Sequence, residues 1–164
     1  MTRIALTAMM LMLTLGQAPA MAQGTGIDFG GLKQDTSQPV EVASDSLQID
    51  QSDGTAMFSG NVLVTQGEMR LSAGSVRVIY AAGAAGRISE MHASGGVTLV
   101  NGAEAAEARE AVYSIDKGTV VMTGDVILTQ GQTALSSNSL VIDLNTGTGT
   151  LEGRVRTVFQ PGSN

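Results

Sequence analysis

The stretch Phe58-Ser-Gly-Asn-Val-Leu-Val-Thr-Gln-Gly67 recurs along this chain and decides its fold. Sixty-four residues later the chain reads Met122-Thr-Gly-Asp-Val-Ile-Leu-Thr-Gln-Gly131, in the same register. Weaker copies are Ala93-Ser-Gly-Gly-Val-Thr-Leu-Val-Asn-Gly102 and Leu151-Glu-Gly-Arg-Val-Arg-Thr157. Self-similarity of this kind is typical of one supersecondary unit that is used several times.

Alternation of apolar and polar residues extends the pattern of these copies over the whole chain from Val40 onward. Leu47 with Ile49, or Val76 with Val78, would lie on one face of a strand, because side chains alternate between the two faces. Residues that turn the chain easily separate the runs, at 44–46, 50–54, 66–67, 73–74, 116–118 and 145–147. We therefore predict an all-β fold of short antiparallel strands.

Two stretches fit this pattern less well. Residues 81–86 are too rich in Ala and Gly to pack against a core. Residues 103–111 have a high intrinsic helix propensity. Gly102 and the strand-like pair Val112-Tyr113 flank this second stretch, so we predict that its neighbours override the propensity and make it a strand.

A glycine stands two residues before a valine in every copy of the unit. Glycine inside a strand weakens it and often marks a bulge, a bend or a close backbone approach. A sheet that bends at the same point in each strand would curl into a trough, so we predict a bend at each of these positions, which are Gly60, Gly95, Gly124 and Gly153. Common ancestry of the copies, without a present role for glycine, is the alternative.

The first residues differ in composition from the rest of the 164-residue chain. Arg3, an apolar run from Ile4 to Leu15 and the small residues around Met21 are typical of a secretory signal peptide with cleavage before Gln23. The apolar run is short for a membrane-spanning helix, although an uncleaved anchor is the alternative. We predict four segments, which are a signal peptide over 1–22, a flexible lead-in over 23–37, one domain over 38–159 and a tail over 160–164.

Composition excludes several classes of function. The net charge of −6 and the lack of a basic patch argue against binding of nucleic acid. His92 is the single histidine, and there is neither a cysteine nor a G-x-S-x-G nucleophile elbow, so the sequence argues against a nucleophilic hydrolase. The acidic residues sit at turns without the spacing of a calcium loop. We predict no enzyme activity, no metal site and no cofactor, in a protein exported to a bacterial periplasm without disulfides.

Four segments resemble the LptA/OstA-like family of periplasmic lipopolysaccharide transport proteins. They are 38–45, 57–67, 71–78 and 121–130, in the order that the family shows. The resemblance implies an open, twisted, V-shaped β-jelly roll that shields the acyl chains of lipopolysaccharide between the inner and outer membranes. It also implies end-to-end homo-oligomers, an LptC-like partner at the inner membrane and an LptD-like partner at the outer membrane.

Carried onto this chain, the resemblance implies two sets of residues. The lipid-binding set occupies the apolar phase and comprises Val40, Val42, Phe58, Val62, Val64, Leu99, Tyr113, Ile115, Met122, Val126 and Leu128. The oligomer-edge set comprises Val40, Glu41, Val42 and Ala43 at one end of the sheet, and Val155, Arg156, Thr157, Val158 and Phe159 at the other. Two alternatives remain, a membrane-anchored LptC-like component and a structural β-repeat module with a closed core.

Overall fold

The computed structural model describes residues 25–28, 30–83 and 86–158. They form one sheet of eleven antiparallel strands and a single turn of 3-10 helix, η1. The elements are β1 (Thr25–Asp28), η1 (Gly30–Leu32), β2 (Glu41–Ala43), β3 (Ser46–Asp50), β4 (Thr55–Gln66), β5 (Met69–Tyr80), β6 (Ile88–Asn101), β7 (Glu104–Ser114), β8 (Thr119–Gln130), β9 (Thr133–Asp143), β10 (Thr148–Glu152) and β11 (Arg156–Val158). The predicted all-β fold is confirmed.

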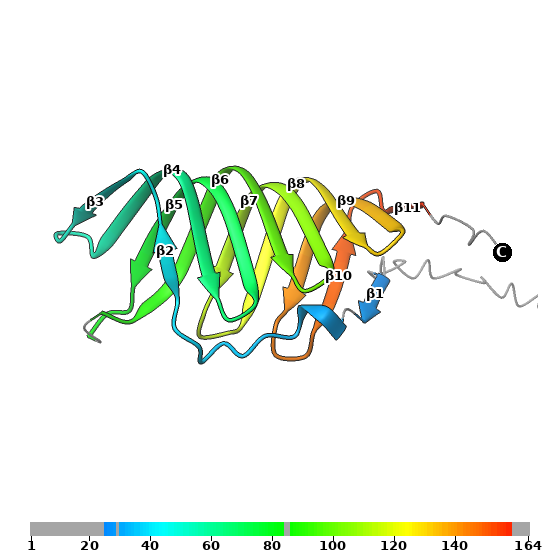
Figure 1. The fold of residues 1–164 in the computed structure, drawn as a ribbon, viewed down its shortest axis with the longest axis horizontal. Helices are drawn as coiled ribbons and strands as arrows, with labels where there is room; N and C mark the ends of the chain where they lie inside the picture. Colours follow the sequence, from blue (N-terminus) through cyan, green and yellow to red (C-terminus); the bar gives the residue numbers. More distant parts are fainter. Residues whose placement is uncertain (1–24, 29, 84–85, 159–164) are drawn as a thin grey trace, which may run out of the picture.

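The sheet is folded over on itself, so that each long strand from β4 to β9 runs through two facing layers (Figure 1). Layer A contains β2, the half of β4 that pairs with it, the matching halves of β5 to β9, and β11. Layer B contains β3, the other halves of the long strands, β10 and β1. The sheet is not closed, and the layers meet at a crease on one side and part at a mouth on the other.

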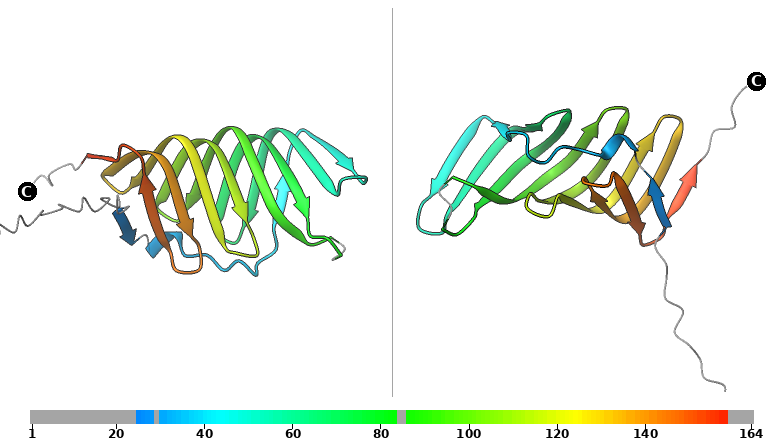
Figure 2. Two further views of the ribbon diagram at one scale, coloured as in Figure 1. Left: turned by 180° about the vertical axis from the view of Figure 1, so that it is seen from behind. Right: turned by 90° about the horizontal axis from the view of Figure 1, so that it is seen from below.

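The crease is built from β-bulges at the repeated glycines. The pairing register shifts between Ser59 and Val62, between Ser94 and Val97, and between Thr123 and Val126. Within each shift two successive residues have positive φ, such as 82° and 81° at Gly95 and Gly96. Two residues opposite one on the partner strand bend a strand and raise its twist. The bends predicted at Gly60, Gly95 and Gly124 are therefore present as bulges, whereas Gly153 lies between β10 and β11, outside both strands. Figure 2 shows the folded sheet from behind.

The neighbouring strands decide the secondary structure of the two stretches that fit the alternating pattern less well. Residues 104–114 form β7, because pairing with both β6 and β8 outweighs the helix propensity of the alanine-rich run. The described part of 81–87 forms a turn between β5 and β6. One turn prediction is wrong, because Ala73 and Gly74 lie inside the continuous strand β5. Gly74 is there because the bulge packs on it: a Cβ at Gly74 would lie 3.1 Å from the carbonyl oxygen of Gly95.

The lead-in differs from the prediction of a flexible segment over 23–37 in the part that the structure describes. Strand β1 pairs with β10, and Leu32 is only 1% exposed. The predicted signal peptide and the tail over 160–164 lie outside the described residues. Within the described ranges, no helix is both long and apolar enough to cross a bilayer.

Candidate functional site

The interior between the layers is a continuous apolar core that runs the length of the sheet. All eleven residues of the predicted lipid-binding set belong to it or pack against it. Seven are buried, namely Val62, Val64, Leu99, Tyr113, Met122, Val126 and Leu128, and four are partly buried at its margin, namely Val40, Val42, Phe58 and Ile115. The period of two and the bulges together explain this, since each bulge changes the strand's direction while keeping the apolar side chains inside.

Cross-strand rows connect these residues. One row in layer A runs from Val42 through Val64, Leu99 and Leu128 to Thr157, with one residue from every strand of that layer. A parallel row in layer B begins at Leu47 and passes through Phe58. Side chains in such rows lie close enough to pack directly against one another. The interior is therefore one uninterrupted apolar surface.

The space between the two layers, which we call the trough, is open to solvent at its β3 end. Leu47 and Ile49 share the inward phase with Phe58 and Ala56, their partners on β4, yet they are 52% and 61% exposed. A pocket of about 710 Å³, lined in part by Ile49 and Tyr80, lies at this end. The interior thus continues to solvent at the first strands of the sheet.

The mouth has a polar margin on layer A. Gln66, Asn101, Glu104 and Gln130 occupy the inward phase at the ends of their strands, and we call these four residues the polar rim. The Gln130 amide donates to Glu104 Oε1 at 2.8 Å. Glu104 is 5% and Asn101 2% exposed, and their Oε2 and Nδ2 atoms have no hydrogen-bond partner among the described residues. Buried polar atoms without a partner are costly and uncommon.

Residues 30–40, which we call the strap, cross this mouth from β1 in layer B to β2 in layer A (Figure 1; Figure 2, right). The Gln34 backbone N–H donates to the Leu144 carbonyl at 2.8 Å, and its side-chain amide donates to the Gln66 carbonyl at 2.7 Å. The Gln66 side chain in turn donates to the carbonyls of Thr36 and Gln38, both at 2.9 Å. The strap therefore ties the two layers together.

Tyr113 completes this network from the opposite layer. Its hydroxyl donates to Gln66 Oε1 at 2.6 Å, and its side chain is 1% exposed. Burial disfavours the charged phenolate and raises the Tyr113 pKa to about 12, although the hydrogen bond with Gln66 partly opposes the shift. The neutral hydroxyl is therefore a hydrogen-bond donor over the whole physiological range.

The predicted oligomer edges lie at opposite ends of layer A. Strand β2 ends the sheet on one side, and β11, which pairs only with β9, ends layer A on the other. The strands are one or two residues shorter than predicted, since Val40 precedes β2 and Val155 precedes β11. Phe159 lies outside the described residues. Edge strands of this kind present backbone groups that can pair with another chain.

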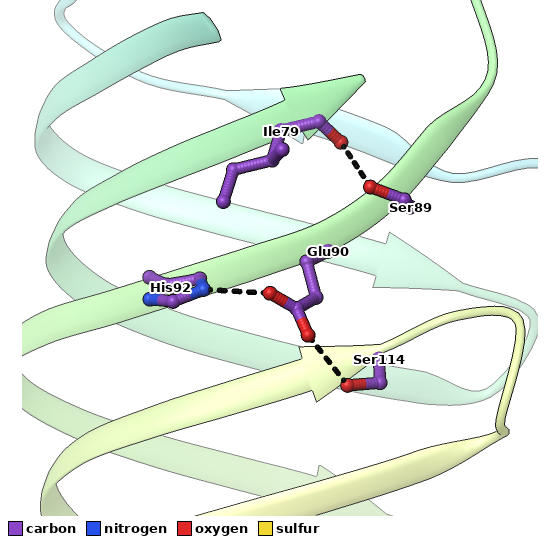
Figure 3. A network of polar contacts seen from close by, with 5 residues as sticks. All are labelled: Ile79, Ser89, Glu90, His92 and Ser114. Atoms are coloured by element: carbon purple, nitrogen blue, oxygen red, sulfur yellow. Dashed lines mark hydrogen bonds and ion pairs between the residues drawn. The ribbon is translucent and has the colours of Figure 1, made fainter. Parts of the chain in front are cut away.

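The outer face of layer B carries His92 and Glu90, the polar residues that would be the candidates for acid–base catalysis. His92 is exposed, and its Nε2 lies 3.0 Å from Glu90 Oε2 (Figure 3). The contacts with His92 and with the Ser114 hydroxyl lower the pKa of Glu90. The pair points away from the interior, and no group of three or more His, Asp or Glu side chains in the described part of the chain is placed to hold a metal ion.

Sequence reasoning missed the strap and the polar rim. Gln66 follows Val62 and Val64 at the same spacing of two, which is a signal for an inward position. It also precedes Gly67, and the pair Gln66-Gly67 is typical of a turn. Leu32 is one apolar residue among polar and glycine neighbours, so no periodicity marks it as buried.

Comparison with known proteins now identifies the family. Residues 41–148 match the family described as LptA/(LptD N-terminal domain) LPS transport protein. The chain belongs to this family. The family resemblance inferred from the repeated unit is thus confirmed, and the match covers every strand from β2 to the start of β10.

Individual relatives and a solved structure show further similarity. An uncharacterized protein of Rhizobium meliloti is 32% identical over 154 residues, which cover 88% of this chain and 83% of that protein. The lipopolysaccharide export system protein LptA of Escherichia coli K12 is 31% identical over 107 residues, or 58% of this chain and 55% of that protein. The crystal structure of LptH from Pseudomonas aeruginosa superposes with a TM-score of 0.69 at 20% identity, covering 78% of this chain and 99% of that one, and supports the fold.

Proposed function

We propose that this protein is a non-enzymatic carrier that shields the acyl chains of lipopolysaccharide in the periplasm, during transport from the inner to the outer membrane. The observation that carries the proposal is the uninterrupted apolar interior, which spans the sheet and is open at the β3 end. Burial of roughly ten methylene groups at about 0.8 kcal/mol each would contribute on the order of 8 kcal/mol. Binding therefore needs no specific polar contact.

The edges of layer A support end-to-end association of copies, and of this protein with the same kind of fold in an LptC-like inner-membrane partner and an LptD-like outer-membrane partner. Strand β11 of one copy and β2 of the next would add to a single ladder, because both lie in the same cross-strand row. The apolar rows of successive copies would then form a longer trough. Transport along such a trough requires no reaction.

Photocrosslinking from two adjacent residues tests the lipid-binding role. Phe58 points inward and is partly buried, whereas Met57 pairs with Arg77 and borders a pocket on the outer face. A benzophenone side chain replacing Phe58 should give a lipopolysaccharide adduct in cells, and the same group at 57 should not. No adduct at 58 would favour the structural module with a closed core, and equal adducts at both positions would contradict binding in the interior.

The mass of the exported protein tests the remaining alternative. A start near Gln23 is expected for a carrier that is free in the periplasm, because the signal peptide has then been cleaved. A start at Met1 would instead support the membrane-anchored, LptC-like component.

A further inference from the structure

We propose that the strap is a displaceable lid over the mouth of the trough, and that acyl chains are admitted through this mouth as the strap leaves. The inference rests on the proposed function, since it concerns how the lipid reaches the interior. Three features of the mouth carry it, which are the buried leucine of the strap, the unpartnered carboxyl oxygen beneath the strap and the network that holds the strap in place.

The first feature is Leu32, which occupies the apolar interior at the mouth. Its side chain is 1% exposed and belongs to the core cluster, although the residues around it in the chain are polar or glycine. Interior side chains such as Val78, Met122 and Leu140 are fully shielded from solvent. An acyl chain therefore has to replace something, and Leu32 is a single apolar group that can be withdrawn without breaking the sheet.

The second feature is the Glu104 carboxyl group of the polar rim, which the strap covers without providing a hydrogen-bond partner for both of its oxygens. A Cβ at Gly31 would lie 3.1 Å from Glu104 Cδ, so η1 sits directly on the Glu104 carboxyl group. Glu104 Oε2 and Asn101 Nδ2 remain without a partner among the described residues. Removing the strap would expose the Glu104 carboxyl group to water or to the polar head group of a bound lipid. The closed mouth is thus opposed by a desolvation cost that opening relieves.

The third feature is that the strap is held by a few hydrogen bonds, and all but the bond from the Gln34 backbone N–H to the Leu144 carbonyl converge on Gln66. Gln66 accepts from Gln34 and Tyr113 and donates to Thr36 and Gln38. The long strands beneath are paired with their neighbours on both sides of the crease, and these pairings do not involve the strap. The strap can therefore open as a unit, between its anchors at β1 and β2, while the two layers stay folded.

A reversible lock tests this lid. The sequence has no cysteine, so Gly31→Cys combined with Glu104→Cys places the only two thiols on the strap and on the rim beneath it. With purified lipopolysaccharide as the probe, the oxidised variant should bind about tenfold more weakly or worse than the same molecule after reduction. Wild-type protein under oxidising and reducing conditions is the control. Equal affinity of the oxidised and reduced variant would overturn the proposal.

Hydrogen exchange gives a second test that needs no substitution. The Gln34 amide, bonded to the Leu144 carbonyl, should be protected in the free protein and lose about tenfold or more of its protection when lipopolysaccharide saturates it. Amides in the centre of β8 are the internal control. Retained protection at Gln34 in the saturated protein would overturn the lid. Failure of wild-type protein to bind lipopolysaccharide at all would instead refute the proposed function on which the lid rests.

Discussion

Alanine substitutions at Gly95 and Gly96 should separate the two reasons for glycine at the crease. The two residues have φ values of 82° and 81°, a region that costs an L-residue about 1–2 kcal/mol. A Cβ at Gly96 meets nothing within 4 Å, whereas a Cβ at Gly95 would lie 3.2 Å from Gly74 Cα. Gly96→Ala therefore reports backbone strain alone, and Gly95→Ala adds a steric conflict with the backbone of β5.

The expected losses in the free energy of unfolding follow from the backbone strain and the steric conflict. Strain at Gly96 is offset by about 0.4–1 kcal/mol, because alanine restricts the unfolded chain, so a net loss of roughly 1 kcal/mol is expected. Gly95→Ala should lose a further 1–3 kcal/mol or so from overpacking, since the contacted atom is backbone and cannot rotate away. The larger loss at Gly95 is the result that identifies close packing of β6 on β5.

Urea unfolding followed by circular dichroism measures both losses as changes in the free energy of unfolding. The dependence of that free energy on urea concentration should stay the same, because neither substitution changes the surface that unfolding exposes. Equal losses for the two variants, or a smaller loss for Gly95→Ala, would refute the claim that the crease requires glycine for close packing as well as for its φ.

Three further predictions concern the interior, the mouth and the edge. Leu128→Ala should lower the free energy of unfolding by about 2–5 kcal/mol, while Ile127→Ala on the outer face, where the side chain is 45% exposed, should lower it far less in the same urea assay. The raised Tyr113 pKa stabilises the fold fully below pH 10, and this contribution of about 2–3 kcal/mol should be lost as pH rises toward about 12. The advantage of wild type over Tyr113→Phe in unfolding free energy should shrink across that range, and a constant difference would contradict the burial argument. Val42→Pro in the edge strand β2 should lower end-to-end association in light scattering and leave monomer unfolding largely unchanged, whereas unchanged association would argue against β2 as a seam.

Much of the fold could be predicted because the sequence repeats the same pattern of alternating apolar residues and glycines. Alternation at Val62 and Val64, or at Val126 and Leu128, specifies which face is buried, and the glycine before each valine specifies the bend. The helix propensity of 103–111 could be discounted because the strands on both sides of it were already evident. Repetition thus gave local signals strong enough to predict a long-range arrangement.

The mouth could not be predicted in the same way, because its contacts depend on a single passage of the chain. Leu32 has no periodic partner, and Gln34 contacts residues more than thirty positions away on both layers. From the sequence, the residues of the polar rim are expected to be ordinary, exposed strand ends, because a glutamine or glutamate beside a turn is usually solvated. Only the position of the strap in three dimensions converts these residues into a buried network.

The crease also determines how the protein must unfold. Each strand from β4 to β9 passes through it and is paired on both sides of it, so neither layer can melt while the other survives. Pairing joins almost entirely strands that follow each other in the chain, as in a linear array of repeats. Loss of structure is thus expected to start at an end and advance strand by strand, and the proposed addition of one copy's edge to the next would remove one such starting point.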